Sequence, residues 1–333
     1  MMALTAEQKA VRVNFLGGSD APVVVGVCPF KSPIQLWLEK RGESVDEEET
    51  EAMFWGNRLE DEIVRVWSER TGNKIRRAST RWSRVHPFMA VNMDRQIIGH
   101  KRGPGYLEAK NFGQWTGGHI QSDDDVHDYV KIQCQHGLAV TEYEWAAYAI
   151  LIGGQRLFCG EVERDETVID FLIEAEAKFW QMVQEGVQPE MDGRERTAKF
   201  LKHLFPRDHG EALVVTDPHL MGLAKQLVDV KAKLKALEEE KEKLNNTFKL
   251  IMKDHQILKI PDWGGLEWKN NKDKPVEVFM EEEFKAAHPD LYKQFTKKYI
   301  KEGARVFTVH EGKDYDKPKK ANKQKAAEAL VAG

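Results

Sequence analysis

Cysteine is scarce in this chain of 333 residues, and no two of its three cysteines form a C-x-x-C pair. They stand far apart, at Cys28, Cys134 and Cys159. Disulfide frameworks, zinc clusters and four-cysteine iron–sulfur clusters need more cysteines or closer spacing, so the sequence argues against all of them. We therefore expect a reduced, cytoplasmic protein.

Long apolar runs are also missing. No stretch approaches the roughly 20 apolar residues that a membrane-spanning helix needs. The N-terminal sequence MMALTAEQKAVRV lacks the apolar core of a signal peptide. We expect no membrane partner. The length leaves room for one large domain or two ordinary ones, with an ample core.

An excess of positive charge is absent too, because the net charge is −4. The charge is nevertheless distributed unevenly. Between Glu69 and Lys110 there are ten Lys and Arg residues against three Asp and Glu residues, a net of +7, whereas Glu39 to Glu51 has two against seven, a net of −5. The basic segment contains Trp82 and a group of four arginines: Arg76, Arg77, Arg81 and Arg84. Such a surface would bind a phosphate backbone without reading its sequence, and a salt-bridged surface strand is the alternative.

The most informative stretch is FMAVNMDRQIIGHKRGPGYLEAK, residues 88–110. It places Asp94 between two short apolar segments. A turn-rich connection over residues 99–105 follows, and Glu108-Ala109-Lys110 stands on a second apolar run. This order predicts a hairpin. Side chains at positions i and i+2 of a strand share a face, so Glu108 and Lys110 are expected to point the same way.

Two carboxylates and a lysine on neighbouring strands fit a metal-dependent site that cleaves phosphodiesters. Mg²⁺ prefers oxygen ligands, often one or two carboxylates together with water and substrate phosphate, and Asp94 and Glu108 can supply them. Lys110 could orient the attacking water, help to deprotonate it, or stabilise charge on the phosphate. Because charged residues make up 31% of the chain, a solvated hairpin face is the alternative.

Three further segments carry polar residues at informative places. Glu60 borders the apolar stripe of a predicted helix, where a carboxylate can reach inward; an ordinary exposed glutamate is the alternative. Gln133 lies in a second predicted helix, Tyr129 to Val140, where glutamines are most often polar surface. Ser19 follows two glycines and precedes a small apolar run, which predicts a helix N-cap. With Arg12 nearby, such a helix start is a candidate phosphate site, and a plain cap is the alternative.

Taken in order, these segments resemble the YqaJ-type viral recombinase family, which is related to lambda exonuclease within the PD-(D/E)xK nuclease superfamily. The resemblance covers about residues 10–185 and rests on GGSDAPVVVGVCPFKSPIQLWLEKRGE, WGNRLEDEI, the aspartate, LEAK and IQCQHGLAVT. It implies an α/β (α+β) fold with a restriction-endonuclease-like core, in which helices flank a central mixed sheet. We assign this core to residues 1–205.

The resemblance also implies roles for single residues. Glu60, Asp94, Glu108 and the Ala109 carbonyl would be the metal ligands, for two Mg²⁺ ions with Mn²⁺ as a substitute. Lys110 would be the catalytic lysine, and Gln133 would help to position it or the nucleophilic water. Arg12 and Ser19 would hold a 5′-terminal phosphate. The chain departs from the family pattern at Arg95, where many relatives have glycine, and at Asn111, where a cysteine or small residue is common.

The function implied is that of a phage-type DNA exonuclease of recombination, encoded by a phage or prophage and acting in the bacterial cytoplasm. It would digest the 5′-ended strand of linear duplex DNA and leave a 3′ overhang for a single-strand annealing protein. Two alternatives stay open. One is a structure-selective or site-selective endonuclease on the same fold. The other is a non-catalytic DNA-binding or scaffold protein.

Residues 206–333 are expected to form a separate extension. A heptad pattern predicts a long helix over about residues 217–254, with ten core positions: Leu220, Leu223, Leu227, Val230, Leu234, Leu237, Lys241, Leu244, Phe248 and Ile251. This helix could form a coiled coil, within the chain or between copies in a homo-oligomer, or lie on its own domain. Short strands over 257–269, helix over 281–300 broken at Pro289, and a strand at Arg305 to Val309 complete a small α/β segment. A polar, mobile basic tail is expected from Lys313.

Overall fold

The structure is a computed structural model that describes residues 11–43, 49–208, 210, 212–214, 216–270, 278–297 and 307. The chain divides into two compact units, residues 1–205 and 206–333. Among the described residues, no helix combines the length and the apolar character needed to cross a membrane. Cys28 and Cys134 are buried, Cys159 is exposed, and all three are free thiols.

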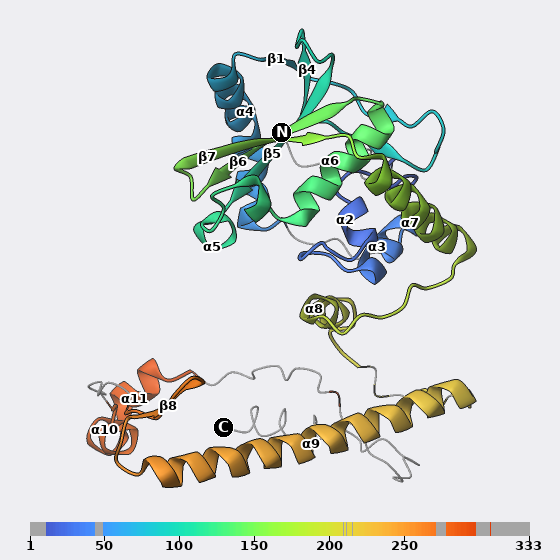
Figure 1. Cartoon of the computed structure of the whole chain (residues 1–333). Helices are drawn as coiled ribbons and strands as arrows, with labels where there is room; N and C mark the ends of the chain where they lie inside the picture. The colour runs from blue at the N-terminus through green and yellow to red at the C-terminus, as the bar shows by residue number, and fades with distance from the viewer. Residues whose placement is uncertain are drawn as a thin grey trace. The chain divides into compact units, whose positions relative to one another are not determined.

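A five-stranded mixed sheet, with strand order β1-β4-β5-β6-β7, is the frame of the first unit (Figure 1). Strands β5 and β6 run parallel, and the other neighbours are antiparallel. The strands are β1 (Lys74–Arg76), β4 (Arg95–Ile98), β5 (Gly105–Phe112), β6 (Trp145–Ile152) and β7 (Arg156–Glu163). A separate two-stranded pair joins β2 (Arg81–Trp82) to β3 (Ala90–Val91). This arrangement confirms the predicted α/β fold with a central mixed sheet flanked by helices.

Two long helices of the first unit, α4 (Glu51–Thr71) and α7 (Glu166–Glu185), begin and end as the capping rules predict. Thr50 and Asp165 cap α4 and α7 with side-chain hydrogen bonds, and both helices end at a left-handed glycine. The helices are α2 (Ala21–Val24), α3 (Pro33–Lys40), α4 (Glu51–Thr71), α5 (Gln114–Gly117), the 3₁₀ turn η1 (Asp123–Asp125), α6 (Asp128–Thr141), α7 (Glu166–Glu185) and α8 (Glu195–Leu204).

Opposite faces of the sheet are covered by different helices, because side chains alternate along each strand. Leu107 of β5 and Trp145 of β6 pack with Trp67 of α4. Tyr106, one residue earlier on β5, packs instead with Leu138 of α6. Fully burying such side chains contributes about 1.5–3 kcal/mol each. Glu108 and Lys110 have the same parity along β5 as Tyr106, so they face α6.

The hairpin predicted between Asp94 and Glu108 is present. β4 pairs with β5 around the connection over residues 99–104, with Ile97 opposite Gly105. β6 pairs with β7 across Gly153 and Gly154, both of which have positive φ. β5, α6 and β6 form a parallel crossover unit, and β6 has the nearly continuous apolar sequence typical of a strand buried on both faces.

The prediction for Ser19 was wrong in one respect. The N-cap position of α2 belongs to Asp20, and α2 is only four residues long with no side-chain cap hydrogen bond. Pro22, within the first turn, was the sequence signal for this later start. The carboxylate of Asp20 turns back and accepts a hydrogen bond from the Gly17 amide at 2.9 Å.

The second unit is built around α9 (Pro218–Met252), whose first turn is capped by Asp217. A hairpin of β8 (Ile257–Ile260) and β9 (Gly264–Glu267) follows, and then α10 (Glu281–Ala287) and α11 (Pro289–Phe295). The long helix and the break at Pro289 are as predicted, and Gly264 and Gly265 open the second strand of the hairpin. The predicted strand at Arg305 to Val309, apart from Phe307, and the tail from Lys313 lie outside the described residues.

Candidate active site

Glu108, Lys110 and Gln133 form a closed triangle of hydrogen bonds between β5 and α6. Lys110 Nζ donates to Glu108 Oε1 at 2.7 Å and to Gln133 Oε1 at 2.9 Å. Gln133 Nε2 donates to the same Glu108 oxygen at 2.6 Å. The amide of Gln133 therefore has a defined orientation, with its oxygen toward the ammonium and its nitrogen toward the carboxylate.

The position of α6 over β5 depends on a glycine. A Cβ atom on Gly137 would lie 2.5 Å from the ring of Tyr106, which is closer than real Cβ atoms come. Tyr106 also donates a hydrogen bond from its hydroxyl to the Gln133 carbonyl at 2.9 Å. Close approach at Gly137 and anchoring by Tyr106 thus hold Gln133 over the strand that carries Glu108 and Lys110.

Asp94 lies immediately before β4 and reaches across to β5. Its Oδ2 accepts a hydrogen bond from the Ala109 amide at 2.7 Å. Burial, followed by the negative charges of Glu108 and Glu60, raises the pKa of Asp94 well above its ordinary value. Burial alone would lower the pKa of Lys110, but the charges of Glu108 and Asp94 raise it, so Lys110 is an ammonium ion here.

Glu60, on α4, is held by an arginine rather than facing the other carboxylates freely. Arg95 ion-pairs with Glu60 at 3.2 Å and also contacts Asp61 and the Asp94 carbonyl. The Arg95 side chain is only 8% exposed, so this guanidinium is an internal counter-charge. Burial raises the pKa of Glu60, and Arg95 opposes that rise.

The oxygen donors fit a divalent cation only in part. Glu108 is a buried carboxylate and Asp94 a half-buried one, and hard cations prefer such oxygen ligands. The main chain of Ala109 lies against Asp94. Within the described part of the chain, however, no three His, Cys, Asp or Glu side chains gather closely enough to form a ready metal site. Glu60 is instead paired with Arg95 in this arrangement.

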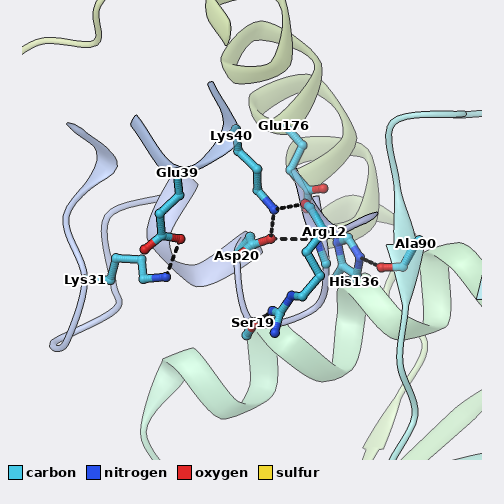
Figure 2. A network of polar contacts seen from close by, with 10 residues as sticks. Arg12, Ser19, Asp20, Lys31, Glu39, Lys40, Ala90, His136 and Glu176 are labelled. Carbon is cyan, nitrogen blue, oxygen red and sulfur yellow. Dashed lines mark hydrogen bonds and ion pairs between the residues drawn. The ribbon is translucent and has the colours of Figure 1, made fainter. Parts of the chain in front are cut away.

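Arg12 and Ser19 are in direct contact, and their segment borders the triangle (Figure 2 draws this pair with its surroundings). Arg12 NH2 donates to Ser19 Oγ at 3.0 Å. A Cβ atom on Gly18 would lie 3.3 Å from Cγ of Gln133, so the backbone beside Ser19 packs on the side chain of Gln133. The structure thus brings this pair close to the residues on β5 and α6.

The four arginines of the basic segment are spread over different contacts. Arg76 donates to Gln96 at 2.8 Å, and Arg77 ion-pairs with Asp61 at 2.7 Å. Arg81 lies over the ring of Tyr143, with its guanidinium carbon 5.1 Å from the ring centroid. Arg84 is exposed. The salt-bridged alternative therefore applies to Arg77, whereas the exposed Arg84 keeps its charge toward solvent.

Several buried charged residues close to this site were not predicted. Asp20 and Lys40 form an ion pair at 2.7 Å, and His136 contacts Glu176 at 2.9 Å. Asp20 lies just before α2. The other three residues, Lys40, His136 and Glu176, belong to α3, α6 and α7 in that order. Charged residues so far apart in the sequence carry no spacing pattern, and only the position of Asp20 before Pro22 gave a local signal.

Comparison with known proteins places the chain in a family. Residues 7–144 match the model of the YqaJ-like viral recombinase domain. The chain is 30% identical over 295 residues to the uncharacterized protein YqaJ of Bacillus subtilis (strain 168), covering 85% of this chain and 88% of that protein. The chain belongs to the YqaJ-like viral recombinase family, as its sequence segments indicated.

Two solved structures are among those that resemble part of the chain. The alkaline exonuclease LHK-Exo of Laribacter hongkongensis aligns with a TM-score of 0.47 and 17% identity, over 55% of this chain and 94% of its own. A phage-related exonuclease from Haemophilus somnus 129PT aligns with a TM-score of 0.39 and 15% identity, over 52% of this chain and 96% of its own.

Proposed function

We propose that this chain is a Mg²⁺-dependent deoxyribonuclease that degrades the 5′-ended strand of linear duplex DNA. Its product would be a 3′ single-stranded overhang, which a single-strand annealing protein would use in phage-type recombination. The observation that carries the proposal is the triangle of Glu108, Lys110 and Gln133 beside the half-buried carboxylate of Asp94. A carboxylate pair next to an ammonium and an oriented amide is suited to phosphodiester hydrolysis.

Asp94, Glu108 and the Ala109 carbonyl would hold Mg²⁺ or, in its place, Mn²⁺. A cation bound there supplies the Lewis acidity that activates water at neutral pH and offsets charge on the phosphate. Glu60 would join the ligand set through its second carboxylate oxygen, because Oε1 already lies 3.2 Å from the Arg95 guanidinium. Glu60 would thus serve a second ion while it stays paired with Arg95.

Lys110 and Gln133 would position the reacting groups. An ammonium that donates to Glu108 and Gln133 can redirect one of its three protons to a phosphate oxygen, where negative charge builds up. The Gln133 amide keeps Lys110 and Glu108 in fixed relation, and it can orient the attacking water through a small rotation. These roles need a protonated lysine, which agrees with its raised pKa.

Arg12 and Ser19 would bind the 5′-terminal phosphate. A guanidinium offers paired donors that match phosphate oxygens, and a hydroxyl adds a further donor. Because Gly18 packs on Gln133, a phosphate held by this pair would lie a short distance from the scissile bond. The arginines Arg76, Arg77, Arg81 and Arg84 would contact the DNA backbone, with Arg84 the most available.

The proposal is tested with linear duplex DNA labelled at either the 5′ or the 3′ end, incubated with Mg²⁺. We expect early release of the 5′ label as short products, while the 3′ label stays on long fragments. Closed circular DNA is the matched control, because an exonuclease leaves it intact. Cutting of the circle would favour the endonuclease alternative, and failure to bind divalent cations would favour the non-catalytic alternative.

A further inference from the structure

Asp20 and Lys40 form a buried ion pair that belongs to neither the carboxylates nor the lysine of the proposed nuclease site. Lys40 Nζ lies 2.7 Å from Asp20 Oδ2, and both side chains are only 4% exposed. Withdrawing two charges from water is costly, and apolar residues often replace such pairs without loss of stability. Stability alone therefore does not explain this pair, and the groups that it holds in place are the more informative feature.

The pair forms hydrogen bonds at both ends of the segment that carries Arg12 and Ser19 (Figure 2). At one end, Lys40 Nζ donates to the Arg12 carbonyl at 2.8 Å. At the other end, Asp20 directly follows Ser19, and its Oδ2 accepts from the Gly17 amide at 2.9 Å. One ammonium and one carboxylate oxygen thus fix the backbone on both sides of the contact between Arg12 and Ser19.

The charges also suit a phosphate-binding segment. An unpaired carboxylate beside Ser19 would repel an anion, whereas the ion pair with Lys40 neutralises the charge of Asp20. Burial alone would raise the pKa of Asp20, but the positive charges of Lys40, Arg12 and Lys31 hold it well below its usual range. Asp20 is therefore ionised, and its negative charge is directed to Lys40, away from solvent.

We propose that Asp20 and Lys40 are positioning residues that set the geometry of Arg12 and Ser19 and thereby determine the preference of the enzyme for 5′-phosphorylated DNA ends. This inference rests on the proposed function, in which Arg12 and Ser19 take the terminal phosphate. Neither residue of the pair touches the phosphate. They act by keeping the guanidinium and the hydroxyl at the spacing that a phosphate can bridge.

The test compares the full-length protein with Lys40→Met and with the double variant Asp20→Asn/Lys40→Met. The double variant keeps the side-chain volumes and leaves no lone buried charge, so it covers the case in which Lys40→Met alone fails to fold. Two ratios are measured on duplexes that differ only in a 5′-phosphate or a 5′-hydroxyl. One is the ratio of kcat/KM in Mg²⁺, and the other is the ratio of binding affinities in EDTA.

In both variants, we expect each ratio of phosphorylated to hydroxyl ends to fall at least about tenfold, a change of about 1.4 kcal/mol. The fall in the kcat/KM ratio should come mainly from a higher KM for phosphorylated ends. Activity on hydroxyl ends should stay within about threefold of the wild type, which corresponds to well under 1 kcal/mol. Val183→Ala is the matched control, since Val183 is buried in a core cluster with residues of α2 and α3 and carries no charge. It should lower thermal stability and leave both ratios unchanged.

The possible results distinguish failure of the positioning role from failure of the proposed nuclease function. A wild-type preference that persists in both variants overturns the positioning role and leaves the nuclease proposal intact. A wild-type protein that cleaves but binds both ends equally overturns the phosphate anchor and the positioning role together. If no cleavage occurs, the affinity ratio in EDTA still decides whether the pair governs phosphate binding.

Discussion

One oxygen of Glu108 accepts hydrogen bonds from both Lys110 and Gln133, so the loss of either donor changes the same carboxylate. We expect Lys110→Met to lower single-turnover cleavage by about 100- to 1,000-fold, the usual cost of removing one charge-stabilising donor. Lys101→Met is the matched control, because Lys101 is exposed in the β4–β5 turn. Equal rates for the two variants would refute the proposed role of Lys110.

Protonation of the buried His136 side chain should make the stability of the protein depend on pH. Its Nδ1 faces Glu176 Oε1 at 2.9 Å, and its Nε2 faces the Ala90 carbonyl at 3.0 Å, so both ring nitrogens meet acceptors. Burial alone would lower the pKa of His136, but Glu176 and the Ala90 carbonyl raise it. A raised folded-state pKa stabilises the protein fully below the unfolded value of about 6.5, and this contribution is lost as pH rises through the folded value.

We therefore expect the unfolding free energy of the wild type to fall between about pH 6.5 and the raised pKa. His136→Gln should lack this slope. Urea unfolding at a series of pH values measures both proteins. Parallel curves for wild type and variant would show that His136 does not carry the pH dependence.

At the scale of elements, two helical glycines should respond oppositely to the same substitution. Gly137→Ala in α6 would push a Cβ atom into Tyr106, and overpacking of this kind costs about 1–3 kcal/mol. Gly56→Ala in α4 meets nothing within 4 Å and should gain up to about 1 kcal/mol from helix propensity. Denaturant unfolding measures both changes. Similar effects at the two positions would contradict the close packing of α6 on β5.

The leucine face of α9 predicts self-association. Leu234 and Leu237 are 54% and 61% exposed at heptad core positions. In a parallel pair of these helices, Lys233 of one copy would meet Glu238 of the other, a favourable pairing at the g and e positions. We expect Leu234→Asp to shift the sedimentation of the full-length protein toward a smaller species. Asp in place of Lys235, outside the heptad core, is the control and should leave the distribution unchanged.

Periodic patterns made most of the elements predictable, because they repeat along the chain. A period of two residues predicts the strand that carries both Glu108 and Lys110. A period of 3.6 residues predicts the helix that carries Gln133. The triangle between them followed from resemblance rather than from spacing. The pairing of Asp20 with Lys40 could not be predicted, because it depends on how α2 and α3 pack and not on any local sequence pattern.

Arg95 illustrates the same limit. The sequence marked it as a departure from glycine, but its position beside Glu60 depends on how α4 packs against the sheet. The N-cap of α2 differs from the prediction for a simpler reason. Gly17 and Gly18 favour a turn directly before a helix, but Pro22 in the first turn favours a start one residue later.

For the whole molecule, the location of the site within one compact unit yields a prediction about truncation. Every residue of the proposed nuclease site lies within residues 1–205. We expect a protein truncated after Phe205 to fold cooperatively and to keep Mg²⁺-dependent cleavage, with a rate within about tenfold of the full chain, equivalent to 1.4 kcal/mol. Circular dichroism and the end-label assay measure these properties. An insoluble or inert product would show that residues 206–333 complete the core or its assembly.

The β5–α6–β6 crossover has a consequence for the order in which the protein becomes active. Gln133 is 25 residues from Glu108 and 23 from Lys110, so the triangle closes within one short supersecondary unit. Arg12 and Ser19 must instead come back across more than a hundred residues to reach Gln133. Loop-closure entropy rises with that distance, and contacts of long range form late in folding. A refolding chain should therefore gain the ability to cut DNA before it gains the ability to choose its end.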